Sequence, residues 1–361
     1  MISINHFPHT TFLQQTTLIK FCRKIRQSLL TQNKMSKYLL YAFGEIILVV
    51  IGILLALNIN NRNQQKINED KITNILKEIQ QDLVSDVERS KEIFDRFIRA
   101  DSIQDLILND KYTYNDYKSK KARRLPFWYV DFVINTNGYD NLMRNIDNVP
   151  EKYEPLLKDL KNLYVDKKAG IDVYNVRIRE TVYKNIDHVW TSYDWNRDWI
   201  MGKHTDDAYN YYLNASEYKN MVMLYMNDRS NTFSISQSYS FSAIEAYHKI
   251  NELTKSVVDS IPKVLALEPE DTSFLNNIVG HYKLKHSMDL NWPKDLKTIQ
   301  ITKEGNRLNL ITENGDSELR FHKESTFLID RALYVQFNKP KKGQLFVSGN
   351  MHGQRTYIKE E

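Results

Sequence analysis

The chain has 361 residues, a mean hydropathy of −0.54 and one cysteine, Cys22, so an intrachain disulfide is excluded. The formal charge of +5 would suit a nucleic-acid-binding protein, but residues 1–44 carry six lysines and arginines and no acid. Residues 45–361 therefore sum to −1 (+5 − 6), and the positive charge does not belong to the larger part of the chain. We expect no nucleic-acid partner.

The first predicted element is a membrane-spanning helix. Residues Tyr38–Leu57 read YLLYAFGEIILVVIGILLAL, with one charge, Glu45, and no proline. Twenty helical residues rise about 30 Å, the thickness of a bilayer's hydrocarbon core. The basic flank before the segment predicts a cytoplasmic tail over residues 1–37 by the positive-inside rule. We predict an uncleaved anchor over residues 38–60, with the residues from about 61 outside the cytoplasm, because the leader is too long for a typical signal peptide.

One face of this helix is a candidate interface. Glu45, Gly52 and Ala56 are spaced at i, i+7 and i+11, and Gly52–Ala56 is a small-xxx-small pattern that allows close helix approach. An unpaired acid at this depth costs on the order of 2.5–3.5 kcal/mol on insertion scales. The face predicts self-association or a partner transmembrane helix; the alternative is that Glu45 reaches the interface or is protonated without a partner.

Residues 61–125 predict a long amphipathic helix, because no glycine or proline occurs between Gly52 and Pro126. Apolar residues recur there at mostly three- and four-residue spacing, which is typical of a core-facing stripe. A plain bundle helix and a dimeric coiled coil both fit this pattern, although the heptad slips near Val87. The stripe consists of Ile72, Leu76, Ile79, Leu83, Val87, Phe94 and Phe97.

Residues 126–262 predict the rest of an antiparallel bundle of four or five helices. A short helix is expected through Leu156–Tyr164, and a longer one after Ala169-Gly170 to about Trp190. Its expected buried side is Val173, Val176, Ile178, Val182, Ile186 and Trp190. Further helices are expected near Asp206–Tyr212 and over Ser236–Ser260.

An aromatic patch, Trp190–Tyr212, joins these helices. It holds seven aromatic residues among several charges, and its candidate ligand-binding residues are Trp190, Trp195, Arg197, Trp199 and His204. Aromatic faces could stack a sugar or peptide that the polar groups hydrogen-bond. The alternative is a hairpin tip whose aromatic residues cap the bundle core.

Residues 271–361 predict a small antiparallel β domain, a curled sheet or barrel of six to eight strands. Period-2 alternation replaces helical spacing, for example at Ile299/Ile301 and Leu308/Leu310, and turns are expected at residues 304–306 and at Asn314-Gly315. The segment FLNNIVGHYKL resembles the start of small β domains that follow the catalytic part of some secreted bacterial hydrolases. The predicted fold class is thus a membrane-anchored α+β protein.

Residues Phe21–Gln27 and Ser36–Asn60 carry a second resemblance. The basic FCRKIRQ segment followed by SKYLLYAFGEIILVVIGILLALNIN resembles the N-terminal signature of a family of single-pass membrane proteins of Gram-negative bacteria. That family has no assigned activity, so the resemblance implies location and architecture only. It implies the bacterial inner membrane, with the residues from about 61 in the periplasm.

The chain carries no catalytic, cofactor-binding or metal-binding motif that we recognise. Glu245 and His248 have the E-x-x-H spacing of di-iron bundles, but such sites need two of these motifs and two more glutamates. We therefore expect a non-enzymatic extracytoplasmic binding or scaffold module without a cofactor. The alternatives are a ligand-sensing subunit that acts through a partner membrane protein, and a hydrolase whose site lies in Trp190–Tyr212.

Overall fold

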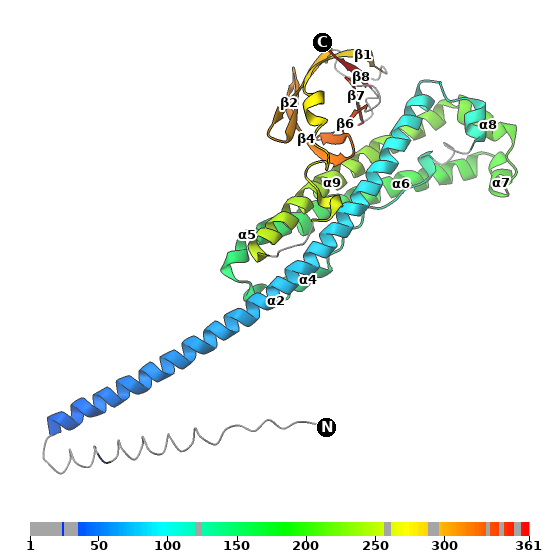
Figure 1. Ribbon diagram of the computed structural model, residues 1–361. Coiled ribbons are helices and arrows are strands. Elements are labelled where there is room, and N and C mark those ends of the chain that lie inside the picture. The colour runs from blue at the N-terminus through cyan, green and yellow to red at the C-terminus, as the bar shows by residue number, and fades with distance from the viewer. Residues whose placement is uncertain are drawn as a thin grey trace, which may run out of the picture. The chain divides into compact units, whose positions relative to one another are not determined.

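The structure is a computed structural model, and the chain divides into two units, residues 1–70 and 71–361, each described by itself (Figure 1). Most of the predicted basic tail, residues 1–37, lies outside the described residues. The structure describes residue 24 and residues 35–119, 125–255, 261–287, 296–329, 333–338, 343–349 and 355–360.

One helix, α2 (Met35–Leu108), contains both the predicted apolar segment and the predicted amphipathic segment. In the first unit its apolar side chains have no protein to pack against. The leucine, isoleucine, valine and phenylalanine side chains from Leu39 to Ile59 are between 43% and 79% exposed. The most apolar 18-residue window has a mean hydropathy of 2.6 and no buried residue, so by length and composition this helix could cross a membrane.

The second part of α2 is amphipathic, as predicted. All seven side chains of the expected stripe, from Ile72 to Phe97, are buried. The first five join a core in which Leu83 and Val87 lie with Leu160 and Tyr239 of the later helices, whereas Phe94 and Phe97 join a second core. The periodicity therefore identified the face of α2 that packs into the second unit.

Helices cover most of residues 113–278, and Figure 1 shows α2, α6 and α9 side by side over much of this part. Their bounds are α3 (Tyr114–Lys118), η1 (Leu125–Phe127), α4 (Asn137–Met143), η2 (Ile146–Asn148), η3 (Glu151–Tyr153), α5 (Glu154–Lys161), η4 (Asn162–Lys167), α6 (Lys168–Ser192), α7 (Trp195–Ile200), α8 (Asp206–Asn214), α9 (Ser216–Thr254), η5 (Lys263–Leu265) and α10 (Leu275–Ile278).

Contacts along α9 show that it runs antiparallel to its neighbours. Lys249 pairs with Asp159 of α5, and His188 of α6 pairs with Glu217 at the other end of α9. Against α2 the order is also reversed. The Gln80 amide donates to Asn251 at 2.6 Å, and the Ser90 hydroxyl donates to the Ser236 carbonyl at 3.1 Å. Among the described residues the bundle thus has three long helical columns and several short helices, instead of four or five full helices.

The prediction that one helix ends and another begins at Ala169-Gly170 is wrong. The column runs without interruption from Glu154 to Ser192 through η4, a π-helical turn. Gly170 sits inside this column, where an added Cβ would lie 3.3 Å from the Ile235 side chain of α9. The glycine therefore permits a close approach of two helices instead of ending one.

The prediction of which side of α6 is buried is also wrong in part. Ile178 and Val182 are buried, but Val173 is 65% exposed and Val176 is 47% exposed. Asn175, Thr181 and Asn185 share the buried face of α6 instead. The Asn175 amide, for example, bonds the backbone N–H and carbonyl of Phe132. A helix face inferred from the apolar residues of α6 alone is therefore rotated about the helix axis relative to the face that is buried in the structure.

The last helix begins twenty residues earlier than predicted, at Ser216. The added part carries buried polar residues that hide the apolar period, among them Asp228 and Thr232. The Asp228 carboxylate accepts a hydrogen bond from Thr181 and pairs with Arg177, so its burial is compensated. The expected end of this helix, residues 256–260, lies outside the described residues.

The described residues after Val279 form a closed antiparallel barrel of eight strands in sequence order. The strand pattern was predicted, and the structure resolves the choice between sheet and barrel, because β1 pairs with β8 as well as β2. The strands are β1 (Gly280–Ser287), β2 (Thr298–Glu304), β3 (Arg307–Thr312), β4 (Gly315–Lys323), β5 (Thr326–Ile329), β6 (Leu333–Phe337), β7 (Gln344–Gly349) and β8 (Arg355–Lys359).

Two of the barrel's hairpin turns occur where glycine was expected to set the geometry. Gly305, between β2 and β3, has φ +61°, and Gly315 has φ +123° at the start of β4. The second turn is shifted by one residue from the expected Asn314-Gly315. Glu313 and Asn314 are its two central residues, since Thr312 pairs with Gly315.

The barrel packs on the bundle through its β4–β7 side. The Phe94 ring of α2 contacts the His322 ring at 4.1 Å and the Tyr334 ring at 5.6 Å between centroids. A second, polar contact is buried beside it: the Ser348 hydroxyl donates to the Asp101 carboxylate at 2.8 Å. Burial and the nearby Asp105 raise the pKa of Asp101 to about 7.

Candidate functional site

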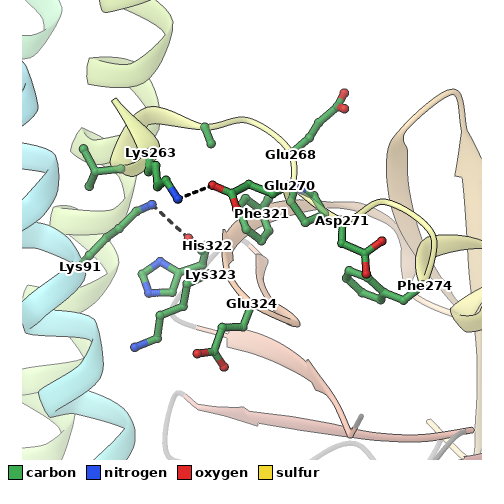
Figure 2. A pocket seen from close by; sticks show the side chains of 13 residues that line it. Lys91, Lys263, Glu268, Glu270, Asp271, Phe274, Phe321, His322, Lys323 and Glu324 are labelled. Carbon is green, nitrogen blue, oxygen red and sulfur yellow. Dashed lines mark hydrogen bonds and ion pairs between the residues drawn. The ribbon is translucent and has the colours of Figure 1, made fainter. Parts of the chain in front are cut away.

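A pocket of about 500 Å³ lies where α2, the segment before the barrel, and the β4–β5 turn meet (Figure 2). We call it the Lys91 pocket. Concave sites of about this volume commonly bind small molecules, and this one carries more charged side chains than such sites usually do. Its lining consists of Lys91, Lys263, Val264, Ala266, Glu268, Pro269, Glu270, Asp271, Phe274, Phe321, His322, Lys323 and Glu324.

Lys91 reaches the pocket because it interrupts the buried stripe of α2. It lies four residues after Val87 and three before Phe94, both of which are buried. Residues at these spacings share one helix face, so the lysine stem runs along the apolar core. Its ammonium group donates to the His322 carbonyl at 3.0 Å.

The opposite wall comes from the end of β4 and the turn after it. The pairing of β4 with β5 shifts between Phe321 and Lys323, which is the mark of a β-bulge. Bulges redirect side chains and are frequent beside functional sites. In the turn that follows, Glu324 has φ +50°, a left-handed conformation that few non-glycine residues adopt. Phe321, His322 and Lys323 consequently all face this one pocket.

The three lysines of the pocket differ in their pairing. Lys323 pairs with Asp95 of α2, and Lys263 pairs with Glu270 at 2.7 Å. Lys91 pairs with no carboxylate in the described part of the chain, and its ammonium group donates to a neutral carbonyl, that of His322. Burial, and then the charge of Lys323, lower the pKa of Lys91 to about 8. At neutral pH the pocket therefore holds an ammonium group whose charge is weakly compensated.

His322 is a buried, neutral imidazole beside this lysine. Its side chain is only 3% exposed, and its Nε2 atom has no hydrogen-bond partner among the described residues. Burial, Lys91 and Lys323 lower the pKa of His322 to about 2. An unpaired buried nitrogen costs about 1–3 kcal/mol, so it is a place where a ligand or water would contribute a bond.

Taken together, these residues suit binding of an anion with an apolar body. Lys91 offers the charge, and Phe274, Phe321 and Val264 offer apolar contact. In the part of the chain that the structure describes, no three histidine, cysteine or acidic side chains are grouped so as to hold a metal ion.

The predicted ligand patch lies at the tip of the α6–α9 hairpin. The structure brings Trp195, Trp199 and His204 together: Trp199 lies 6.2 Å from Trp195 and 4.3 Å from His204 between ring centroids. Arg197 points away, with 81% of its side chain exposed, and Trp190 is 59% exposed. These are the contacts expected of a cap on the bundle core, and the ligand-binding interpretation remains a prediction.

A second, smaller hollow of about 250 Å³ adjoins this tip. Trp190 and Trp199 both line it, so two of the five predicted patch residues share one concave surface. The lining has no charged side chain and one amide. It comprises Phe127, Trp128, Ile186, Val189, Trp190, Asn196, Trp199, Ile200 and Tyr212.

The two tryptophans should differ sharply on substitution. Trp195→Ala is expected to lower the free energy of unfolding by about 2–3 kcal/mol, since its ring packs against Tyr193 and Tyr211. Trp190→Ala should change it by less than about 0.5 kcal/mol, because that side chain is mostly exposed. Denaturant unfolding followed by circular dichroism measures both. Equal effects would contradict the cap interpretation.

Glu45, Gly52 and Ala56 lie together on the exposed apolar segment of α2. An added Cβ at Gly52 would meet nothing within 4 Å, so the face is open in the structure. The prediction of a helix interface there stays a prediction.

The residues of the Lys91 pocket were missed in the sequence because they are far apart in it: Lys91 and His322 are separated by 231 positions. One local signal existed. A lysine at the stripe position between Val87 and Phe94 interrupts an otherwise apolar face. Charged side chains are rare on buried faces, so this lysine could have been singled out from the sequence. His322 gives no such signal, because a strand histidine is ordinary.

No protein-family model matches this chain, and no curated protein is detectably similar to it.

Proposed function

We propose that this protein is a single-pass membrane protein that presents a binding module outside the cytoplasm. The observation that carries the proposal is the exposed apolar segment of α2: an 18-residue window with a mean hydropathy of 2.6 and no buried residue. Water is an unfavourable surrounding for so large an apolar surface, whereas a bilayer satisfies it. The basic residues before the segment support a cytoplasmic N-terminus by the positive-inside rule.

The proposed location is the bacterial inner membrane, with the residues from about 61 in the periplasm. The resemblance of Ser36–Asn60 to a family of Gram-negative single-pass proteins supports this placement. The Lys91 pocket is the proposed binding site. We propose a binding or scaffold role, because the pocket combines apolar side chains with an ammonium group, that of Lys91, which has no carboxylate partner among the described residues.

Fractionation and a topology reporter test this proposal. We expect the full chain to sediment with membranes, to resist extraction at high salt and high pH, and to dissolve in detergent. A reporter after residue 361 that is active only outside the cytoplasm should be active. A chain recovered in the soluble fraction, or an inactive reporter on a stable fusion, would overturn the membrane anchor or its orientation.

A second candidate function is a ligand-sensing subunit. The observation that favours it is that Lys91 and the proposed membrane span belong to one helix, α2. A ligand that binds at Lys91 therefore contacts the same element that would meet a partner in the bilayer. Sensing requires differential binding to two states of such an assembly.

The proposed partner contact is testable at the Glu45, Gly52 and Ala56 face. In a two-hybrid assay of membrane helices, Gly52→Ile should weaken association at least several-fold, because small residues allow close packing. Glu45→Leu should weaken it if the acid bonds across the interface. Gly44→Ile is the control, since Gly44 also meets nothing within 4 Å but lies outside the i, i+7, i+11 set. Association that is unchanged in both face variants would refute the interface.

A further inference from the structure

The unpaired charge of Lys91 calls for an anionic ligand group. Its ammonium nitrogen lies 3.0 Å from the His322 carbonyl and is partly removed from water. Charged groups in such surroundings are stabilised by an opposite charge with hydrogen bonds. The neighbouring His322 is a neutral, buried imidazole packed against Phe94, so it brings no second charge to this end of the pocket.

The rest of the pocket limits the charge of that ligand. Its lining has three lysines and four carboxylates, Glu268, Glu270, Asp271 and Glu324, so its formal charge is −1 (3 − 4) with His322 neutral. A dianion such as phosphate would therefore be repelled as a whole. A ligand with one negative group at Lys91 and a positive group elsewhere satisfies both parts of the lining.

The charges are separated in part: Glu270 pairs with Lys263 and Glu324 directly follows Lys323, but the other two acids lie apart from the lysines. Figure 2 shows the three lysines beside the bundle helices, whereas Glu268 and Asp271 lie on the far side of the pocket. Phe321 lies between the two groups in the same view. Of the acids, Glu324 makes no hydrogen bond or ion pair with the described residues, whereas Glu268 accepts one from Asn306. A ligand that spans the pocket thus meets an ammonium group, then apolar surface, then carboxylates.

We propose that the Lys91 pocket binds an apolar zwitterion: a free apolar amino acid or a short peptide with both ends unblocked. Its carboxylate accepts hydrogen bonds from Lys91, its apolar side chain packs on Phe321 and Phe274, and its ammonium group faces Glu268 and Asp271. This inference rests on the proposed function, since it names the ligand of the proposed binding site. The volume of about 500 Å³ suits a molecule of this size.

The direct test is calorimetry on the full chain in detergent or nanodiscs. The probes are phenylalanine, the dipeptide Leu-Phe, the dipeptide with an acetylated N-terminus, and the dipeptide with an amidated C-terminus. We expect phenylalanine or Leu-Phe to bind and each blocking group to weaken binding at least tenfold. Phenylalanine and Leu-Phe differ in the distance between their ammonium and carboxylate groups. The probe that binds more tightly therefore indicates which distance the pocket accepts.

Two variants test which side chains of the pocket bind the carboxylate and the ammonium group of the ligand. Lys91→Met should weaken binding of the unblocked probe by about 10- to 100-fold, the range for losing a hydrogen bond to a charged group. Lys77→Met, an exposed lysine of α2 outside the pocket, is the control. Glu268→Gln should weaken binding of the unblocked probe but not of the acetylated one. Glu313→Gln, in an exposed turn, is its control.

The outcomes separate this proposal from the previous one. If neither unblocked probe binds, or if both blocked forms bind as well as the unblocked ones, the zwitterion proposal is wrong. Tight binding of inorganic phosphate in competition with the probes would also overturn it. None of these results affects the membrane anchor, which sedimentation and the topology reporter test independently.

Discussion

Asp101→Asn is expected to raise the free energy of unfolding at pH 8 by up to about 4 kcal/mol. Asp101 is buried between α2 and the barrel, and burial, with the charge of Asp105, raises its pKa from 3.8 to about 7. One pKa unit corresponds to about 1.36 kcal/mol, so the shift of about 3 units sets this limit. Asparagine keeps an acceptor for the Ser348 hydroxyl without a charge to bury.

The sign of the pH dependence follows from the raised pKa. Between about pH 4 and pH 7 the folded state holds the proton of Asp101 and the unfolded state has released it, so stability falls as pH rises through this window. Below pH 4 both states are protonated and the penalty is absent. The wild type should therefore lose stability from pH 4 to pH 7, and Asp101→Asn should lose less, although Arg229 moderates the effect.

Denaturant unfolding of the full chain in detergent, at pH 4.5, 6 and 8, measures this difference. Asp110→Asn is the matched control. Asp110 is an exposed residue at φ +57°, a conformation that asparagine also tolerates, and its carboxylate pairs with Lys219 at the surface. We expect a change below about 1 kcal/mol for the control. If Asp101→Asn and the wild type show the same pH dependence, Asp101 is not the buried acid described above.

Gly138→Ala is expected to lower the free energy of unfolding by about 1–3 kcal/mol, although it adds a single methyl group. A Cβ at Gly138 would lie 2.8 Å from the backbone nitrogen of Ile79 and 3.0 Å from its Cα. Backbone atoms cannot rotate away, so α4 must move from α2. That movement would also stretch the bond from the Gly138 N–H to the Asp82 carboxylate, now 2.9 Å.

Gly170→Ala gives the opposite expectation and serves as the comparison. Its new Cβ would meet only the Ile235 side-chain tip, at 3.3 Å, and alanine favours a helix interior over glycine by about 0.5–1 kcal/mol. We expect a change near zero or a small gain in stability. Thermal unfolding of both variants distinguishes the two sites, and equal destabilisation would show that Gly170 lies in a contact as rigid as that of Gly138.

Much of the fold could be predicted because its largest elements repeat a simple period. The stripe from Ile72 to Phe97 and the alternation at Ile299/Ile301 each identify a face that is buried in the structure. The period fails where polar residues replace apolar ones in the core. On α6 and α9, Asn175 and Asp228 are buried with hydrogen-bond partners from other elements. Such partners are distant in the sequence, so no local pattern predicts them.

The candidate site could not be predicted for a related reason. The Lys91 pocket combines one helix residue with a barrel turn more than 200 residues later, and that meeting depends on how the barrel packs on the bundle. The packing uses Phe94 against His322 and Tyr334, three residues that are individually unremarkable. Only the lysine at a stripe position of α2 gave a local signal.

The closure of the barrel has a consequence for the order in which the chain is made. Tyr282 of β1 pairs with Lys359 of β8, so the first strand waits for the last of the eight to be synthesised before its second edge is covered. Until then β1 presents an open edge, the kind of surface that joins strands of other chains. A pause in synthesis or a cut before β8 would thus leave the barrel open along β1 and the chain prone to aggregation, which would expose it to proteolytic quality control.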